Sequence, residues 1–233
     1  MAKSNAELIK HYRSKHELEP VLFSEKSGES EFKEVDGIVV PLKLDLRQYC
    51  SPTDDQGTTP HCAAYSAAQI LEAEYWRETG KLIQLDASHI YAKAKEIDGA
   101  PLADGTYPEA ALQAALNMSK NLLRKSFIVE KLYNDKTERS VLQLKRAIHK
   151  NGFLAGGFLI TDDWYKLRRG DSMLEKTSSR SEGGHCVTIV GYLKDSLIIQ
   201  NSWGKEWGAT GFARISWNVV LKQLIYAAYL EEA

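Results

Sequence analysis

LIIQNSWGKEWGATGFARI, residues 197–215, carries the strongest structural signal in the chain. Its apolar start predicts a β-strand, and Asn201 stands where that strand ends. An Asn amide oxygen in this place can accept a hydrogen bond from an imidazole N–H. A neighbouring tryptophan such as Trp203 can exclude water from that bond and so strengthen it. The alternative interpretation is a glycine-rich turn between two strands with purely structural tryptophans.

A histidine that could bond to Asn201 lies upstream, in GGHCVTIVGY, residues 183–192. His185 follows two glycines and precedes an apolar run that predicts a strand. A histidine at the start of a strand can face a cleft, and glycines let another chain approach closely. A histidine satisfied inside the core is the alternative interpretation of this segment when it is judged alone.

A candidate nucleophile lies in TTPHCAAYSAAQIL. This segment predicts a helix with Thr58 or Thr59 as its cap and Pro60 in its first turn. Cys62 would then feel the positive end of the helix dipole, which stabilises the thiolate, the reactive form of cysteine. Gln56 could donate its amide to an oxyanion beside the nucleophile, together with a backbone N–H at the helix start. A small cysteine buried on an apolar helix face after a Gln-Gly turn is the alternative.

The distribution of periodic segments predicts an α+β protein. Residues at spacings of three and four dominate the first half of the chain, and apolar runs typical of strands dominate the second half. Two of these runs, 187–193 and 197–200, are close enough to form a hairpin. The predicted helices are one that ends at Gly80, 88–97, one that starts near Pro108, and 140–150; the predicted strands are 38–40, 127–133, 153–160, 186–193, 197–200, 211–216 and 226–230.

The glutamine–cysteine pair, GGHCVTIVGY and NSWGKEWGATGF together resemble the papain-like cysteine peptidases, and they occur in the order Gln, Cys, His, Asn of that family. The resemblance covers roughly residues 43–233. It implies a two-lobe α+β fold, with a helical left lobe over about 43–125, an antiparallel β-barrel-like right lobe over about 126–233, and the active-site cleft between them. Residues 1–42 are charged and poorly periodic, and we expect an N-terminal extension or arm there.

The resemblance also implies a cysteine peptidase that hydrolyses peptide bonds through a thioester, without cofactor or metal. Cys62 would attack the substrate carbonyl, and His185 would pair with the thiolate and later protonate the leaving amine. Asn201 would orient His185, and Trp203 would shield the contact between them. Gln56 and the Cys62 backbone N–H would stabilise the oxyanion.

Substrate contacts are implied beside the His, on the preceding strand and on the helical lobe. The small residues at these positions predict a roomy pocket that takes a large apolar side chain. The alternative is that the glycines serve only strand packing. The positions are Asp104, Gly105, Gly156, Gly157, Gly184, Cys186 and Trp203.

The chain departs from the family around its nucleophile. The usual Cys-Gly-Ser-Cys-Trp run reads Thr59-Pro60-His61-Cys62-Ala63, so the disulfide of the family is absent and a bulky aromatic is missing. His61 could be a second base, a steric gate or simply exposed. These departures leave two alternatives open: a binding module that has kept the fold and lost the chemistry, and a cysteine acyltransferase or non-peptide amidase.

The composition limits the partners. The net charge is −1, and nucleic-acid binding needs a basic patch. No apolar run reaches the roughly 18 residues of a membrane span, and the first residues hold none of signal-peptide length. Three cysteines without a CxxC pair argue against a disulfide framework and a zinc site. We therefore expect a cytoplasmic protein that acts on peptides or proteins and binds neither nucleic acid nor membranes, with its oligomeric state unpredicted.

Overall fold

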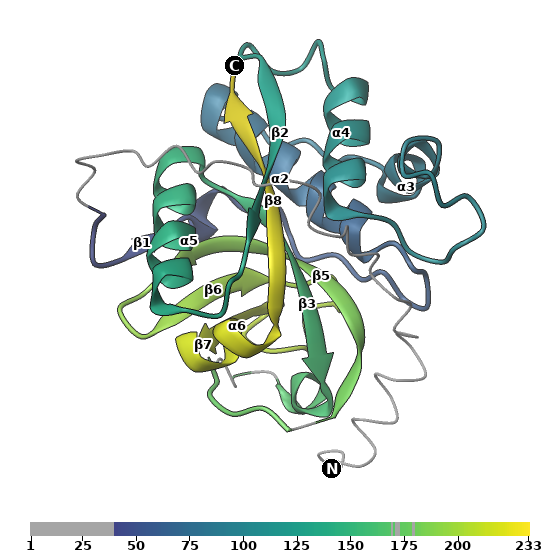
Figure 1. Cartoon of the computed structure of the whole chain (residues 1–233). Coiled ribbons are helices and arrows are strands. Elements are labelled where there is room, and N and C mark those ends of the chain that lie inside the picture. The colour runs from purple at the N-terminus through teal and green to yellow at the C-terminus, as the bar shows by residue number, and fades with distance from the viewer. Residues whose placement is uncertain (1–39, 169, 171–172, 179) are drawn as a thin grey trace.

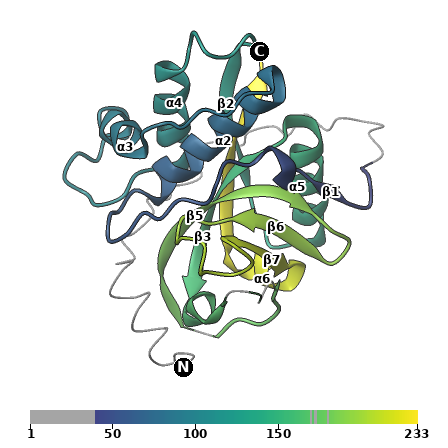
Figure 2. The ribbon, with the colours of Figure 1, turned by 180° about the vertical axis from the view of Figure 1, so that it is seen from behind.

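The computed structural model describes residues 40–168, 170, 173–178 and 180–233. This part of the chain folds into two lobes, one of helices and one built on a large sheet (Figure 1). The two lobes keep the same arrangement when the molecule is seen from behind (Figure 2). The expected arm at 1–42 and the predicted strand at 38–40 lie outside the described residues except for residues 40–42.

The helical lobe contains α2 (Cys62–Thr79), α3 (Ala87–Lys95) and α4 (Pro108–Met118). These helices confirm the three that the periodicity predicts in the first half of the chain. α2 is buried on most sides because its alanines let the other helices and the sheet approach closely. It ends at Gly80, whose φ of 69° lies in the left-handed region that favours glycine.

The start of α2 differs from the prediction. The helix begins at Cys62 itself, and its N-cap residue is His61, which makes no side-chain capping bond. Thr59 instead donates its hydroxyl to the carbonyl of Gln56 at 2.7 Å, which closes a turn before the helix. The predicted cap at Thr58 or Thr59 is therefore wrong, although Cys62 does lie in the first turn.

The second lobe is an eight-stranded sheet in the order β2-β8-β3-β5-β6-β7-β4, with β1 paired to β5. All of its pairings are antiparallel except that of β4 with β7. The predicted strands after residue 125 are confirmed, and β5 and β6 form the predicted hairpin. The strands are β1 (Leu44–Asp45), β2 (Phe127–Tyr133), β3 (Leu154–Thr161), β4 (Met173–Leu174), β5 (Ser181–Tyr192), β6 (Ser196–Gln200), β7 (Phe212–Ser216) and β8 (Leu224–Glu232).

Two further helices belong to this lobe. α5 (Glu138–Asn151) confirms the predicted helix at 140–150 and packs Leu144 and Ile148 inward. α6 (Trp217–Gln223) was not predicted; Ser216 caps it by accepting a hydrogen bond from the N–H of Val219. Short 3₁₀ turns at Arg47–Tyr49 and Asp162–Lys166 complete the described elements.

The long strand β5 holds the molecule together, because β1, β3 and β6 pair with it and α2 packs across it. At Gly191 the main chain of β1 comes so close that a Cβ would lie 2.3 Å from the carbonyl oxygen of Leu44. The φ of Gly191 is 151°, a value that side chains rarely adopt. This glycine therefore permits both the backbone conformation and the close approach of β1.

The two lobes share polar contacts as well as apolar ones. Thr188 on β5 donates its hydroxyl to the amide oxygen of Gln69 on α2 at 2.7 Å. Tyr226 on β8 donates to the Glu109 carboxylate of α4 at 2.6 Å. Within the described ranges, no helix has both the length and the apolar character needed to cross a bilayer. The interface between the lobes is thus held by buried hydrogen bonds that fix how α2 and α4 sit on the sheet.

Candidate active site

Cys62 lies where the helical lobe meets the sheet. It is the first residue of α2 and is only 6% exposed. The backbone N–H of Cys186 on β5 donates to its sulfur. One turn further along α2, the hydroxyls of Ser66 and Thr188 form a 2.9 Å hydrogen bond across the same contact. Helix and strand therefore run side by side, which places Cys62 next to the segment that carries the candidate histidine.

The surroundings of Cys62 favour the neutral thiol. Burial raises the pKa of Cys62 to about 11, although hydrogen bonds from the backbone amides of Cys186, Ala63 and Cys62 itself act in the opposite direction. The amides of Cys62 and Ala63 at the helix start do favour the thiolate, as expected, but burial outweighs them. A reactive thiolate at neutral pH requires a neighbouring base or cation.

His185 is the candidate for that base, since it directly precedes Cys186, whose backbone N–H donates to the Cys62 sulfur. It lies on β5 immediately before Cys186 and is 1% exposed. Its Nε2 lies 2.7 Å from Oδ1 of Asn201, which is fully buried. The N–H of Ser202 donates to the same Oδ1 at 2.8 Å, and a backbone N–H can bond only to an acceptor. The oxygen of Asn201 therefore faces the imidazole, and Nε2 carries the proton of this bond.

Aromatic rings enclose the contact between His185 and Asn201. Trp203 stacks on the imidazole with ring centres 4.6 Å apart, and Tyr165 stacks on Trp203 at 5.2 Å. Trp164 meets the imidazole edge-on at 6.4 Å. All three rings are buried, so water is kept from the hydrogen bond. The sequence interpretation included Trp203 and missed the other two, whose only local signal is an aromatic pair after a strand.

Gln56 is held beside this group by both of its amide atoms. Its Nε2 donates to the carbonyl of Thr59 at 2.9 Å, and its Oε1 accepts from the hydroxyl of Ser202 at 2.6 Å. The backbone N–H of Gln56 also donates to the Ser202 carbonyl at 2.8 Å. One N–H of the amide remains to act outside these bonds. Ser202, which sequence analysis did not single out, thus ties the Gln56 turn to the Asn201 loop.

The predicted substrate-contacting residues occupy two places. One is the β3–β5 ladder next to His185, where Gly157 pairs with Cys186. The other is the loop before α4, where Gly105 has a φ of 78°. Cys186 is 1% exposed and Trp203 lies behind the imidazole. The predicted residues in these places are Asp104, Gly105, Gly156, Gly157, Gly184, Cys186 and Trp203.

Gly156 has a packing explanation. A Cβ at this position would lie 2.8 Å from the ring of Phe158 and 2.9 Å from Cδ1 of Ile189. Those side chains belong to the core of the sheet lobe. Gly156 therefore serves strand packing, whatever its relation to a substrate, and the pocket predicted from its small size does not follow from it.

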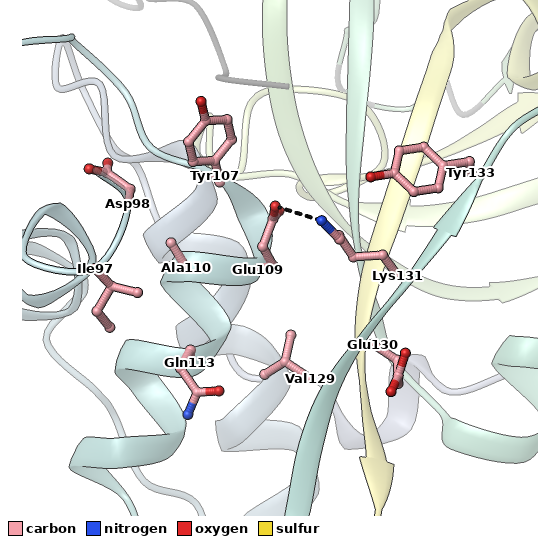
Figure 3. Close-up of a pocket in the computed structure, with 10 residues that line it drawn as sticks. All are labelled: Ile97, Asp98, Tyr107, Glu109, Ala110, Gln113, Val129, Glu130, Lys131 and Tyr133. Atoms are coloured by element: carbon pink, nitrogen blue, oxygen red, sulfur yellow. Dashed lines mark hydrogen bonds and ion pairs between the residues drawn. The ribbon is translucent and has the colours of Figure 1, made fainter. Parts of the chain in front are cut away.

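A separate hollow of about 510 Å³ lies between α4 and β2 (Figure 3). Glu109 and Lys131 face each other across it, 3.3 Å apart, and Tyr107 and Tyr133 stand on its two sides. None of the four candidate catalytic residues lines it. Its lining residues are Ile97, Asp98, Tyr107, Glu109, Ala110, Gln113, Val129, Glu130, Lys131 and Tyr133.

The papain-like α+β fold has a helical lobe packed on a mostly antiparallel sheet. Here the first helix of that lobe starts at Cys62, next to the strand that carries His185. The protein superposes on the proform of the ragweed pollen allergen Amb a 11, a cysteine protease, with a TM-score of 0.72 and 18% identity, over 99% of this chain and 77% of that one. The Carica candamarcensis cysteine protease CMS1MS2 in complex with E-64 gives a TM-score of 0.60 and 20% identity, over 83% and 99% of the two chains.

Sequence comparison agrees with the fold, because the chain is similar to papain family cysteine proteases. The model of that family matches residues 117–228, a range that includes His185 and Asn201 but neither Gln56 nor Cys62. Cysteine proteinase 3 of Entamoeba histolytica is 27% identical over 195 residues, which cover 74% of this chain and 61% of that protein. The chain thus spans about three fifths of the length of this relative.

Proposed function

We propose that the protein is a cysteine peptidase that cleaves peptide bonds through a thioester, with proteins or peptides as substrates. The observation that carries the proposal is the buried hydrogen bond between His185 and Asn201, next to a cysteine at a helix start. A family relationship alone would not distinguish an active enzyme from an inactive relative. The proposal rests on residues of competent type occupying positions where proton transfer and nucleophilic attack can be coupled.

The reaction uses four proton transfers, the last of which returns a proton from His185 to the sulfur, and passes through a thioester. His185 accepts the proton of the Cys62 thiol, and the sulfur attacks the carbonyl carbon of the peptide bond. The oxyanion that forms receives hydrogen bonds from the amide of Gln56 and the backbone N–H of Cys62. His185 then gives its proton to the leaving amine, which leaves a thioester on Cys62. His185 next activates a water molecule, which releases the carboxylic acid and restores the thiol.

The pKa of Cys62 explains why the histidine is needed in this scheme. A thiol whose pKa burial raises to about 11 holds its proton at neutral pH. An imidazolium beside it lowers the free energy of the thiolate, because opposite charges attract strongly in a buried site. Asn201 and Trp203 support that ion pair by holding the ring and excluding water from it.

A binding module without chemistry is the second candidate, and a specific observation favours it. Cys62 is almost completely buried, and the groups that donate to its sulfur are backbone amides. A thiol in this state would be inert without the ion pair. Retention of the fold for recognition of peptides would then be the function.

Hydrolysis of a broad set of quenched peptides separates the two candidates. A peptidase should release product, and Cys62→Ala should abolish that activity while the folded state is retained. Cys50→Ala is a control, since Cys50 is another free cysteine, half-buried, at the end of the 3₁₀ turn Arg47–Tyr49. Peptide binding without hydrolysis by the unaltered protein would favour the binding module.

We also propose that the protein works in a reducing compartment such as the cytoplasm. All three cysteines of the chain, Cys50, Cys62 and Cys186, are free thiols. Disulfides persist in oxidising compartments and are rare where thiols are kept reduced. Activity that depends on added thiol reductant, and is lost reversibly on mild oxidation, would support this assignment.

A further inference from the structure

The loop between α3 and α4 is organised by a single lysine. Lys95, the last residue of α3, points its ammonium into this loop and is only 14% exposed. Its Nζ donates to the carbonyls of Ala100, Ala103 and Gly105 at 2.5, 2.9 and 3.1 Å. An ammonium has three N–H donors, and all of them are directed into this loop.

Asp98 completes the arrangement. Its side chain is fully buried, and its carboxylate lies 2.8 Å from the Lys95 ammonium. It also accepts from the N–H of Ala100 at 2.9 Å and from the hydroxyl of Thr106 at 2.8 Å. Burial acts to raise the pKa of Asp98, but the hydrogen bond from Lys95, together with those from Ala100 and Thr106, outweighs it, so the pKa is lowered. The loop thus closes on a buried ion pair whose charges are satisfied.

The tip of this loop has no apolar anchor. Leu102 at its tip is 98% exposed, so an apolar core does not anchor it there. Gly99 and Gly105 have φ values of 70° and 78°, and such residues confer freedom on an unfolded loop. All cysteines are free, so no disulfide restrains it. The hydrogen bonds of Lys95 and Asp98 are therefore central to the order of this loop.

The same loop reaches the nucleophile. The carbonyl of Gly105, which Lys95 holds, also accepts a long hydrogen bond of 3.5 Å from the hydroxyl of Tyr91. The ring of Tyr91 stacks on that of His61 with centres 4.0 Å apart. His61 is the N-cap residue of α2 and directly precedes Cys62. The loop is consequently part of the wall of the helical lobe next to Cys62.

The hydrogen bonds from Lys95 to the loop carbonyls also fix the direction of the loop N–H groups. In a planar trans peptide unit the C=O and the N–H point in opposite directions. The Ala103 carbonyl points to Lys95, so the N–H of Asp104, an exposed residue, points away from it. Hydrogen-bonding groups in this fixed orientation suit an extended peptide main chain laid along the loop.

From this geometry we propose that Lys95 is a positioning residue for the substrate, which shapes the 98–106 loop so that it binds the peptide main chain beside Cys62. The inference rests on the proposed peptidase function. Lys95 touches neither the reacting atoms nor the nucleophile, so its removal should weaken peptide binding and leave the reactivity of Cys62 intact. If Lys95 only stabilised the fold, its removal would change both peptide binding and the reactivity of Cys62, or neither of them.

Two alkylating reagents distinguish these outcomes in the full chain. Iodoacetamide measures the reactivity of Cys62 itself, because it does not bind to the loop. A blocked Phe-Ala diazomethyl ketone also alkylates Cys62, but its rate depends on how well its peptide part binds. We expect Lys95→Met to slow the peptidyl reagent about tenfold, the usual effect of losing a charged hydrogen-bond donor, and to leave the iodoacetamide rate within about twofold. The KM of a peptide substrate should rise in parallel, with kcat less affected.

Matched variants complete the test. Lys93→Met removes an exposed lysine of the same helix, whose partner is Glu96 at 2.8 Å, and should change neither rate. Lys95→Arg keeps the charge and should recover most of the peptidyl rate. Asp98→Asn keeps the shape of the side chain and should give a smaller loss in the same direction, which serves if Lys95→Met does not fold.

Three results would overturn the proposal. The peptidyl rate could stay unchanged in Lys95→Met and Asp98→Asn, or both reagents could slow in the same proportion. In either case, peptide hydrolysis by the unaltered protein would show that only the role of Lys95 is wrong. If the unaltered protein reacts with iodoacetamide but neither reacts with the peptidyl reagent nor hydrolyses peptides, the proposed function fails together with the role of Lys95.

Discussion

His185 and Asn201 are joined by a 2.7 Å contact between Nε2 and Oδ1, and both residues are almost completely buried. Because Oδ1 also accepts from the N–H of Ser202, the Asn amide has one orientation and the imidazole must donate from Nε2. In the proposed mechanism, the other ring nitrogen, Nδ1, is left to exchange a proton with Cys62. The Asn therefore selects the tautomer of the His as well as its direction.

This relationship predicts that His185 matters more than Asn201. We expect His185→Ala to lower kcat by about 10²–10⁴, the usual contribution of a general acid–base. Asn201→Ala should lower it by only about tenfold, the effect of one buried hydrogen bond, because Trp203 still packs against the ring. Steady-state hydrolysis of one peptide by both variants measures the ranking. Asn117→Ala, on the exposed end of α4, should leave kcat unchanged, and an equal or reversed ranking would contradict the assigned roles.

The anchoring of Gln56 leads to a second prediction. Gln56→Ala removes an oxyanion donor and should lower kcat by about 10²–10³ with little change in KM. Ser202→Ala keeps the amide but removes the hydroxyl that donates to its Oε1 at 2.6 Å, so a smaller fall is expected. Turnover that is unchanged in Gln56→Ala would exclude this residue from the site.

Local patterns in the sequence sufficed for most of the fold. The alanine spacing and Gly80 located α2, and the apolar runs located six strands of the sheet. The predicted threonine cap of α2 was wrong because the hydroxyl of Thr59 donates to the carbonyl of Gln56 instead. The sequence pattern does not reveal this competing partner. α6 was missed because its seven residues are too few for a clear period.

The sequence predicted only those residues of the candidate site that lie in short motifs. Cys62, His185 and Asn201 were found from short segments that resemble a family. Lys95 was not found, because its partners are backbone carbonyls of a loop, and no side-chain pattern records them. The raised pKa of Cys62 was missed for a similar reason, since its burial results from the packing of the whole lobe interface.

The contact between Tyr226 and Glu109 predicts how firmly the lobes are joined. Tyr226 is fully buried and donates to the carboxylate at 2.6 Å, while Lys131 lies 3.3 Å from the other carboxylate oxygen. Tyr226→Phe should therefore lower the free energy of unfolding by about 1–2 kcal/mol. Urea unfolding followed by circular dichroism measures this change. Tyr229→Phe, on the same strand and half-buried, should cost no more than about 0.5 kcal/mol, and equal losses in both variants would argue against the interlobe contact.

The titration of Cys62 provides the most direct test of the ion pair. Burial and three backbone amides set its pKa at about 11, and none of these groups is a cation. A protonated His185 would supply that positive charge. The unaltered protein should therefore react with iodoacetamide well below the pKa of a free cysteine, which is about 8.5. In His185→Ala the reaction should rise only as the pH approaches about 11. Peptide mapping by mass spectrometry separates Cys62 from Cys50, whose pKa burial raises to about 12.

The same variant should show the matching change in stability. Its folded thiol has a pKa above the unfolded value of about 8.5, so the folded state binds the proton more tightly. That contribution to stability is complete below pH 8.5 or so and is lost as the pH rises toward about 11. The Tm of His185→Ala should therefore fall across this interval more steeply than that of the unaltered protein. Identical alkylation profiles for the two proteins would mean that no ion pair forms, and the inactive binding module would then be the better account of this site.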